Sequence, residues 1–329
     1  MGTATMTHSS RVSGAARRRL TELALLLRGC RDASARVGAD HHRIAAPGSV
    51  CASDLAAFRA VAAVSNERLV LEAVLGYLEL AAAQCAGLAA LLDTGEVVAA
   101  PWPLTRAILE DCARARWIIG SQPTAEPALN RLARAYIDND MSAEYEKKIS
   151  GYLRGNRSPA CLAATARFIR LRAEIAAVFP GTSGHDFGKR TIHGQVCLGP
   201  TDTVRWFFDL LARSAALAVD TKAPTAIYDL LSTHTHPTLH SVHAQFLFTA
   251  DTMGSVTPPT IDIAGAEWLA CLAALGVYDA VSVTHRYCGW EFDPDGRLES
   301  LIDRVLPGLP RPADPNARVV PRRSRRGAS

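Results

Sequence analysis

The chain has 329 residues, 48% of them hydrophobic and 6% aromatic, so it can bury a substantial core in one large domain or two smaller ones. Its formal net charge of +4 is uneven: residues 1–43 carry eight arginines against three acids, residues 318–329 carry five arginines and no acid, and the body between is acidic. No stretch of about 20 uninterrupted apolar residues occurs, so we expect no membrane span. Basic ends can contact nucleic acid or remain solvated, and net charge alone does not decide between these.

The eight cysteines form no C-x-x-C pair and show no regular spacing. Four of them, Cys85, Cys112, Cys161 and Cys271, lie in apolar helical patterns, where a thiol behaves as a small buried hydrophobe. The leucine run after Arg17–Arg19 imitates a secretion signal, but it is short and no small-residue cleavage site follows. We therefore expect a reduced, cytoplasmic protein.

The predicted elements are almost all helices. Residues 1–45 mix Arg, Gly, Ser and Ala and predict a basic, mostly disordered arm with at most one short helix near Ala15–Cys30. Residues 46–310 predict a helical domain, and residues 311–329 a disordered tail rich in Pro and Arg. The helices expected in that domain are 53–94 (one long helix, or two broken near Val64), 101–119, 124–154, 159–179, 202–219, 225–236, 237–252, 262–287 and 298–305.

The fold class that follows is all-α, a single bundle-like domain of about eight helices, because alternation with a period of two is nearly absent. The longest irregular stretch is residues 180–200, which hold five glycines and two prolines. Loops of this length inside a compact domain are usually functional or disordered. The side chains there that could bind an anionic ligand are His185, Lys189, Arg190 and His193.

Four histidines lie within ten positions in "YDLLSTHTHPTLHSVH", residues 228–243. Tyr228, Ser232 and His236 are spaced four residues apart and share one helical stripe. Pro237 disfavours helical backbone at the residue before it, so the helix should end or kink at His236. The spacing of His234, His236, His240 and His243 lacks a matching carboxylate pattern, so capping or buried histidines are favoured over a metal site, and we expect no cofactor.

A second polar stripe follows Pro103. Arg106, Glu110 and Trp117 lie on one face of a helix with apolar residues on both flanks. Arg106 and Glu110 are therefore expected to be partly buried, in a polar network inside the core. The alternative is an ordinary surface pair between residues four apart.

The motifs "RAILEDCARARW" and "YDLLSTHTH" resemble those of a diffuse group of bacterial, notably actinobacterial, helical proteins without an assigned function. The resemblance covers Pro101–Thr252. It implies that Arg106, Glu110, Tyr228, Ser232 and His236 converge in one interhelical site, and it supplies no reaction.

The chain is also similar in general character to the HEPN-like helical proteins. Their motif is an Arg followed four to six residues later by a His, and these two residues cleave RNA without a metal. The only match is "RVGADHH", Arg36 to His41 or His42. It lies in the predicted arm rather than on a core helix, so it departs from the pattern of that group.

Three functions stay open. In the first, an interhelical pocket binds a small anionic ligand or acts on nucleotide or RNA, with His236 as general base, Arg106 steadying an anion and Glu110 orienting Arg106, while Tyr228 and Ser232 position the ligand. In the second, the polar pairs only lock the helices and the basic ends contact partners or nucleic acid. In the third, the histidine cluster holds a metal. Whether the protein is an enzyme, and its oligomeric state, cannot be predicted from these patterns.

Overall fold

The computed structural model describes residues 13–39, 45–95, 100–214, 222–236 and 263–309. Within them the chain is all-α, as predicted, with 11 helices rather than about eight and a single two-residue hairpin. The helices are α1 (Gly14–Ala39), α2 (Val50–Arg59), α3 (Leu69–Thr94), α4 (Pro101–Ile119), α5 (Ala128–Arg154), α6 (Pro159–Val178), α7 (Gly184–Lys189), α8 (Pro200–Ser214), α9 (Ala223–Thr235), α11 (Ile263–Cys288) and α12 (Arg297–Val305). The hairpin joins β1 (Thr191–Ile192) to β2 (Gln195–Val196).

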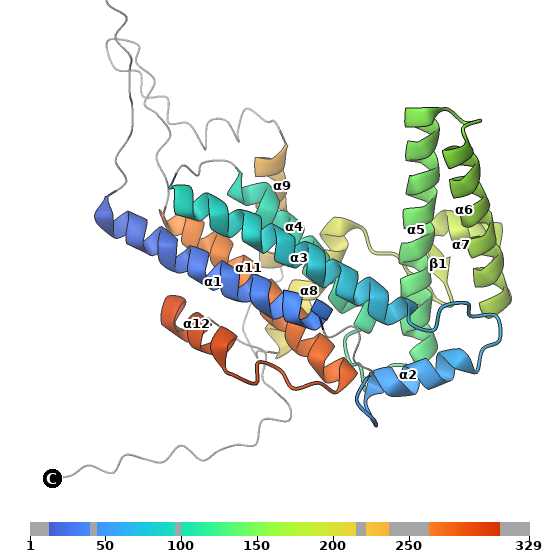
Figure 1. Cartoon of the computed structure of the whole chain (residues 1–329), viewed down its shortest axis with the longest axis horizontal. Helices are drawn as coiled ribbons and strands as arrows, with labels where there is room; N and C mark the ends of the chain where they lie inside the picture. Colours follow the sequence, from blue (N-terminus) through green and yellow to red (C-terminus); the bar gives the residue numbers. More distant parts are fainter. Residues whose placement is uncertain (1–12, 40–44, 96–99, 215–221, 237–262, 310–329) are drawn as a thin grey trace, which may run out of the picture.

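Four long helices form the central core. α1 packs on α3, α3 on α4, α4 on α11, and α11 closes the arrangement against α1 (Figure 1). Gly276 lets α11 approach α4 closely, since a Cβ at this position would lie 3.1 Å from a methyl carbon of Leu109. A second apolar cluster, formed by side chains of α4, α8, α9 and α11, lies beside this core and includes Phe207, Tyr228 and Leu231.

The first helix corrects the prediction of a mostly disordered arm over residues 1–45. α1 covers 26 residues of that arm, and its buried side chains recur every three or four positions, among them Leu20, Leu23, Leu27 and Cys30. This spacing is that of a core helix, and the arginines occupy its other faces. Arg36 therefore lies on a core helix, whereas His41 and His42 lie outside the described residues.

Several other boundaries differ from the prediction. The first helix of the 53–94 segment begins earlier, at Val50, and Ser49 caps it, because its side chain accepts a hydrogen bond from the backbone N–H of Ala52. Between α2 and α3, the Ser65 hydroxyl donates a 2.7 Å hydrogen bond to Glu174 on α6. The break near Val64 is confirmed by the gap between α2 and α3.

The remaining elements surround the core. α12 packs on α1, α8 and α9 pack on α4, and α5 and α6 form a hairpin that projects away from the core helices (Figure 1). α3 and α11 are long and apolar enough to cross a membrane by length and composition, and 78% of the apolar window of α11 is buried inside the protein against 44% for α3. The expectation of no membrane span stays a prediction.

Candidate functional site

The side chain of Arg106 is the centre of a polar group on α4. Its Nε donates a 2.7 Å hydrogen bond to Oε1 of Glu110, one turn further along the helix. Pro101 and Pro103 occupy the first turn, where a missing backbone N–H costs nothing, so the helix is already established when it reaches Arg106. The side chains of Arg106 and Glu110 are 19% and 31% exposed, so the pair is partly buried, as predicted.

α9 supplies the other half of this group. Arg106 donates to the hydroxyl of Tyr228 at 2.8 Å and to that of Ser232 at 3.4 Å. The Tyr228 hydroxyl in turn donates to Oε1 of Glu110 at 2.8 Å, which closes a ring of three hydrogen bonds. The guanidinium also lies over the Tyr228 ring, 5.0 Å from its centre. We call Arg106, Glu110, Tyr228 and Ser232 the Arg106 cluster.

The charges of the cluster are fixed by these contacts. Burial raises the pKa of Tyr228 to about 12, and its hydrogen bond to Glu110 adds to the effect, so the phenol stays protonated. Burial lowers the pKa of Arg106, but the hydrogen bond and charge of Glu110 outweigh it and the pKa is raised overall. The guanidinium uses three of its five N–H groups within the cluster, and among the described residues the other two have no hydrogen-bond partner and could serve a ligand.

A further carboxyl group follows the cluster in sequence. Burial raises the pKa of Asp111 to about 7, and the neighbouring charge of Glu110 contributes. A carboxyl group that changes charge near neutral pH can hold or release a proton under physiological conditions. Asp111 could not be predicted as a site residue, because its desolvation depends on the tertiary packing around it.

Three aromatic side chains lie beside the Arg106 cluster, and the prediction missed all of them as site residues. The rings of Trp102 and His234 are stacked, with centres 3.9 Å apart, and the Trp268 ring lies 5.8 Å from that of Trp102. All three are half-buried. Trp102 could have been found, since it precedes Arg106 by four residues and shares its stripe; Trp268 on α11 carries no local signal.

His236 lies at the end of α9, as predicted. The helix stops at Thr235, and the backbone of His236 is extended with φ −98° and ψ 142°, the conformation that a following proline favours. Its ring is exposed, and its backbone N–H bonds the carbonyl of Ser232 at 3.1 Å. Because Ser232 also contacts Arg106, His236 is one helical turn beyond the cluster rather than on the opposite side of the molecule.

The other histidines of residues 228–243 do not form one group in the described structure. His234 faces Trp102, while His240 and His243 lie outside the described residues. In the part of the chain that the structure describes, no group of three or more His, Cys, Asp or Glu side chains could hold a metal ion. Trp117 is buried beside Arg114 and Arg134, about 16 Å along the helix axis from Arg106, and belongs to another part of the core.

Residues 180–200 correct the prediction of an irregular loop. Ser183 and Asp186 form a capping box that begins α7, and His193 and Gly194, both with positive φ, make the tight turn of the hairpin. The four predicted ligand-binding side chains, His185, Lys189, Arg190 and His193, are all exposed. His193 lies against Phe179, and within the described residues no hydrogen bond or ion pair joins any of the four to the Arg106 cluster.

The fold and the cluster together define an all-helical protein with a partly buried guanidinium site between α4 and α9. No protein-family model matches the sequence, and neither the curated proteins nor the solved structures show a significant match to it.

Proposed function

We propose that the Arg106 cluster binds a small anionic ligand with a flat ring, of the nucleotide class. The observation that supports this most directly is the placement of a partly buried guanidinium, with two N–H groups unused among the described residues, next to the stacked rings of Trp102 and His234. Arginine binds phosphate through paired hydrogen bonds, and aromatic faces accept nucleobases by stacking. Glu110 and Tyr228 would orient the guanidinium, and Ser232 would contribute a further hydroxyl.

Calorimetric titration with AMP, GMP, CMP and UMP tests this proposal. At least one nucleotide should bind, and Arg106→Gln should weaken its binding about tenfold or more, because a charge-assisted hydrogen bond is lost. Arg167→Gln is the matched control, since Arg167 forms an exposed ion pair with Glu146 on the α5–α6 hairpin. Equal affinities of the two variants would contradict the proposal.

An enzymatic version of this function uses His236 as general base. It is the exposed imidazole one turn from Ser232, where a bound ligand could reach it. Incubation of the nucleotide that binds, followed by mass spectrometry, should show turnover by the wild type, none by His236→Ala, and unchanged turnover by the control His185→Ala. Unaltered ligand by wild-type protein would leave a binding protein without catalysis.

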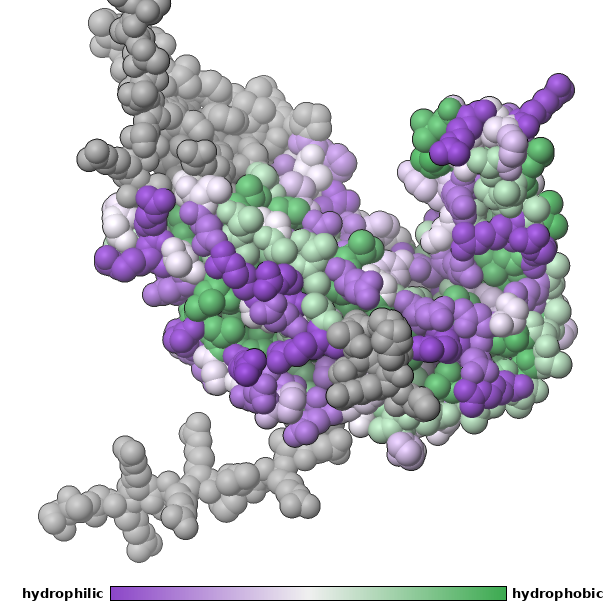
Figure 2. All heavy atoms as spheres, in the orientation of Figure 1, coloured by the Kyte–Doolittle hydropathy of each residue, from purple (hydrophilic) through white to green (hydrophobic). Residues whose placement is uncertain are grey.

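A second candidate function rests on the end of the α5–α6 hairpin. Residues 147–157 contain four basic side chains and no acid, and Tyr152 and Leu153 there are 85% and 77% exposed. Figure 2 shows hydrophobic and hydrophilic residues side by side at this end of the molecule. Basic side chains next to exposed aromatic rings suit contact with single-stranded nucleic acid, as proposed above for the basic ends of the chain.

Fluorescence polarisation with a labelled single-stranded RNA tests the second candidate. Binding should weaken steeply as salt increases, because phosphate contacts release counterions. The double variant Arg154→Gln/Arg157→Gln should bind more weakly than the control Arg205→Gln on α8. Binding that survives the double variant would remove the hairpin from this function.

The protein is proposed to act in the cytoplasm. All eight cysteines are free thiols, which suits a reducing compartment.

A further inference from the structure

A cavity of about 330 Å³ lies at the other end of α11 from the Arg106 cluster. It is formed by the last turns of α1, the end of α11 and the segment from Trp290 to Asp295. Trp268 and His285 are roughly 25 Å apart along α11, so this cavity is separate from the site proposed above. Its volume is at the lower end of the range for small-molecule sites. We call it the Asp293 pocket.

The carboxylate of Asp293 is held rigidly in this pocket. Its side chain is only 3% exposed. Oδ2 accepts a 3.0 Å hydrogen bond from the backbone N–H of Glu299, in the first turn of α12, while Oδ1 is buried and has no hydrogen-bond partner within the described residues. A buried carboxylate oxygen without a donor is costly, and native proteins usually supply one, so a ligand that donates would be stabilised here.

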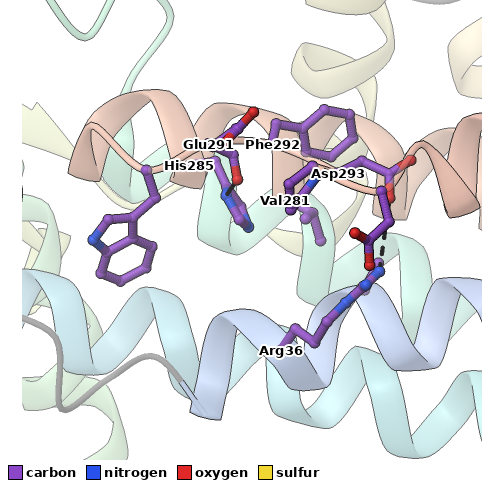
Figure 3. Close-up of a pocket in the computed structure, with 10 residues that line it drawn as sticks. Arg36, Val281, His285, Glu291, Phe292 and Asp293 are labelled. Atoms are coloured by element: carbon purple, nitrogen blue, oxygen red, sulfur yellow. Dashed lines mark hydrogen bonds and ion pairs between the residues drawn. The ribbon is translucent and has the colours of Figure 1, made fainter.

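Arg36 is the cation nearest to this oxygen. Its NH2 lies 3.8 Å from Oδ1 of Asp293, beyond hydrogen-bond distance. Figure 3 shows the side chain rising from α1 with its guanidinium directed at the carboxylate. The Arg36 side chain is 42% exposed, and among the described residues its only ion pair is the one with Asp293. A guanidinium in this state retains the paired N–H groups that bind a ligand carboxylate.

The remaining walls combine apolar and aromatic side chains with two further acidic residues, Glu291 and Asp295. Val281, His285 and Phe292 line the cavity, and Figure 3 shows them grouped on the α11 side of it. The His285 ring is fixed, because its Nδ1 donates a 2.8 Å hydrogen bond to the carbonyl of Glu291. The Phe292 ring is held edge-to-face by Tyr278, with centres 5.2 Å apart. The pocket thus places the buried Asp293 carboxylate and the Arg36 guanidinium beside a preformed apolar surface.

We propose that the Asp293 pocket binds a free α-amino acid with an apolar or aromatic side chain. The ammonium group donates to Oδ1 of Asp293, the carboxylate accepts from Arg36, and the side chain packs on Val281 and Phe292. A zwitterion satisfies both charged groups at once. A plain amine would leave Arg36 without a partner and facing a like charge, and a plain acid would leave Asp293 unpaired.

Calorimetric titration of the full chain with L-phenylalanine and L-leucine tests the proposal. Two comparison ligands each lack one charge: 2-phenylethylamine has no carboxylate and 3-phenylpropanoate has no ammonium. Each should bind about tenfold or more weakly than L-phenylalanine, because each loses a charge-assisted contact. If neither amino acid binds at millimolar concentration, or if phenylethylamine binds as tightly as phenylalanine, the proposal is wrong.

Two variants separate binding from folding. Asp293→Asn removes the charge but keeps a carbonyl oxygen that can accept from Glu299, so it should fold normally and bind L-phenylalanine about tenfold or more weakly. Arg36→Gln should weaken binding similarly, whereas Arg31→Gln should not; Arg31 lies on the same helix with the same 42% exposure and pairs with Asp32. Unchanged affinity in Asp293→Asn, with an unchanged melting temperature, overturns the proposal.

Discussion

Two groups in this protein have the same chemistry and differ mainly in burial. In the Arg106 cluster, an arginine pairs with a glutamate and a tyrosine hydroxyl bonds both of them. Between α2, α5 and α11, Arg131 donates to both oxygens of Asp54 at 2.6 and 2.8 Å, and the Tyr287 hydroxyl donates to Asp54 at 2.8 Å. The Arg131 and Asp54 side chains are only 2% and 3% exposed.

The difference in burial between the two groups indicates how an arginine, a carboxylate and a tyrosine can serve either stability or ligand binding. A buried ion pair is held only while every member is present, because the loss of one partner leaves an uncompensated charge away from water. A partly exposed pair such as Arg106–Glu110 is screened by solvent and contributes less to stability, so its remaining donors are available to a ligand. We infer that the Arg131 group fixes the positions of α2, α5 and α11, and that the Arg106 cluster is the one suited to binding.

Substitution of Asp54 in the buried Arg131 group should cause the greatest loss of stability. Asp54→Asn should lower the free energy of unfolding by about 3–5 kcal/mol, because the Arg131 charge stays buried without its counterion. Urea denaturation followed by circular dichroism measures this loss. The double variant Asp54→Leu/Arg131→Met, which removes both charges, should be more stable than the single one; equal or lower stability would contradict this interpretation.

Asp111, beside the Arg106 cluster, should make stability depend on pH. Its pKa is about 7 in the folded protein against an ordinary value of 3.8, so its stabilising contribution is complete below about pH 4 and is lost as pH rises to about 7. Asp111→Asn should therefore be more stable than the wild type by about 1–3 kcal/mol at pH 8 and equal to it near pH 4. Denaturation at a series of pH values measures the difference, and a difference independent of pH would exclude Asp111 as its source.

Removal of one hydroxyl group tests the Arg106 cluster itself. Tyr228→Phe should reduce the free energy of unfolding by about 1 kcal/mol, because Arg106 and Glu110 keep each other and some access to water. The same substitution should weaken nucleotide binding, since the guanidinium loses one of its orienting contacts. Thermal denaturation measures the loss of stability, and calorimetric titration of the same preparation measures the loss of nucleotide affinity. A loss as large as that of Asp54→Asn would show that the cluster is structural.

Substitution of an exposed ion pair should cause the least loss of stability and serves as the reference for the two groups. Arg167 and Glu146 form a 2.7 Å ion pair across the α5–α6 hairpin, with side chains about half exposed. Arg167→Gln should change the free energy of unfolding by less than about 0.5 kcal/mol, because solvent screens the pair. Urea denaturation at low and high salt checks this. A larger change in the free energy of unfolding would mean that exposure alone does not explain the difference between the Arg106 cluster and the Arg131 group.

Much of the Arg106 cluster could be predicted because its halves are local. Helical periodicity alone places Arg106 beside Glu110 and puts Tyr228 on the stripe of Ser232. That the two stripes face each other was implied by the resemblance to other helical proteins, not by the spacing. The Arg131 group could not be found in this way, because Asp54 and Tyr287 are 233 residues apart.

Local sequence patterns were enough to predict the all-α class, most of the helices from α3 onward, and the end of α9 before Pro237, since each depends on neighbours within a few residues. Packing between distant segments was needed to place α1 in the core, Trp268 beside Trp102 and His234, and Arg36 beside Asp293. These depend on which helix surfaces bury each other, and burial is a property of the packed chain rather than of any local segment.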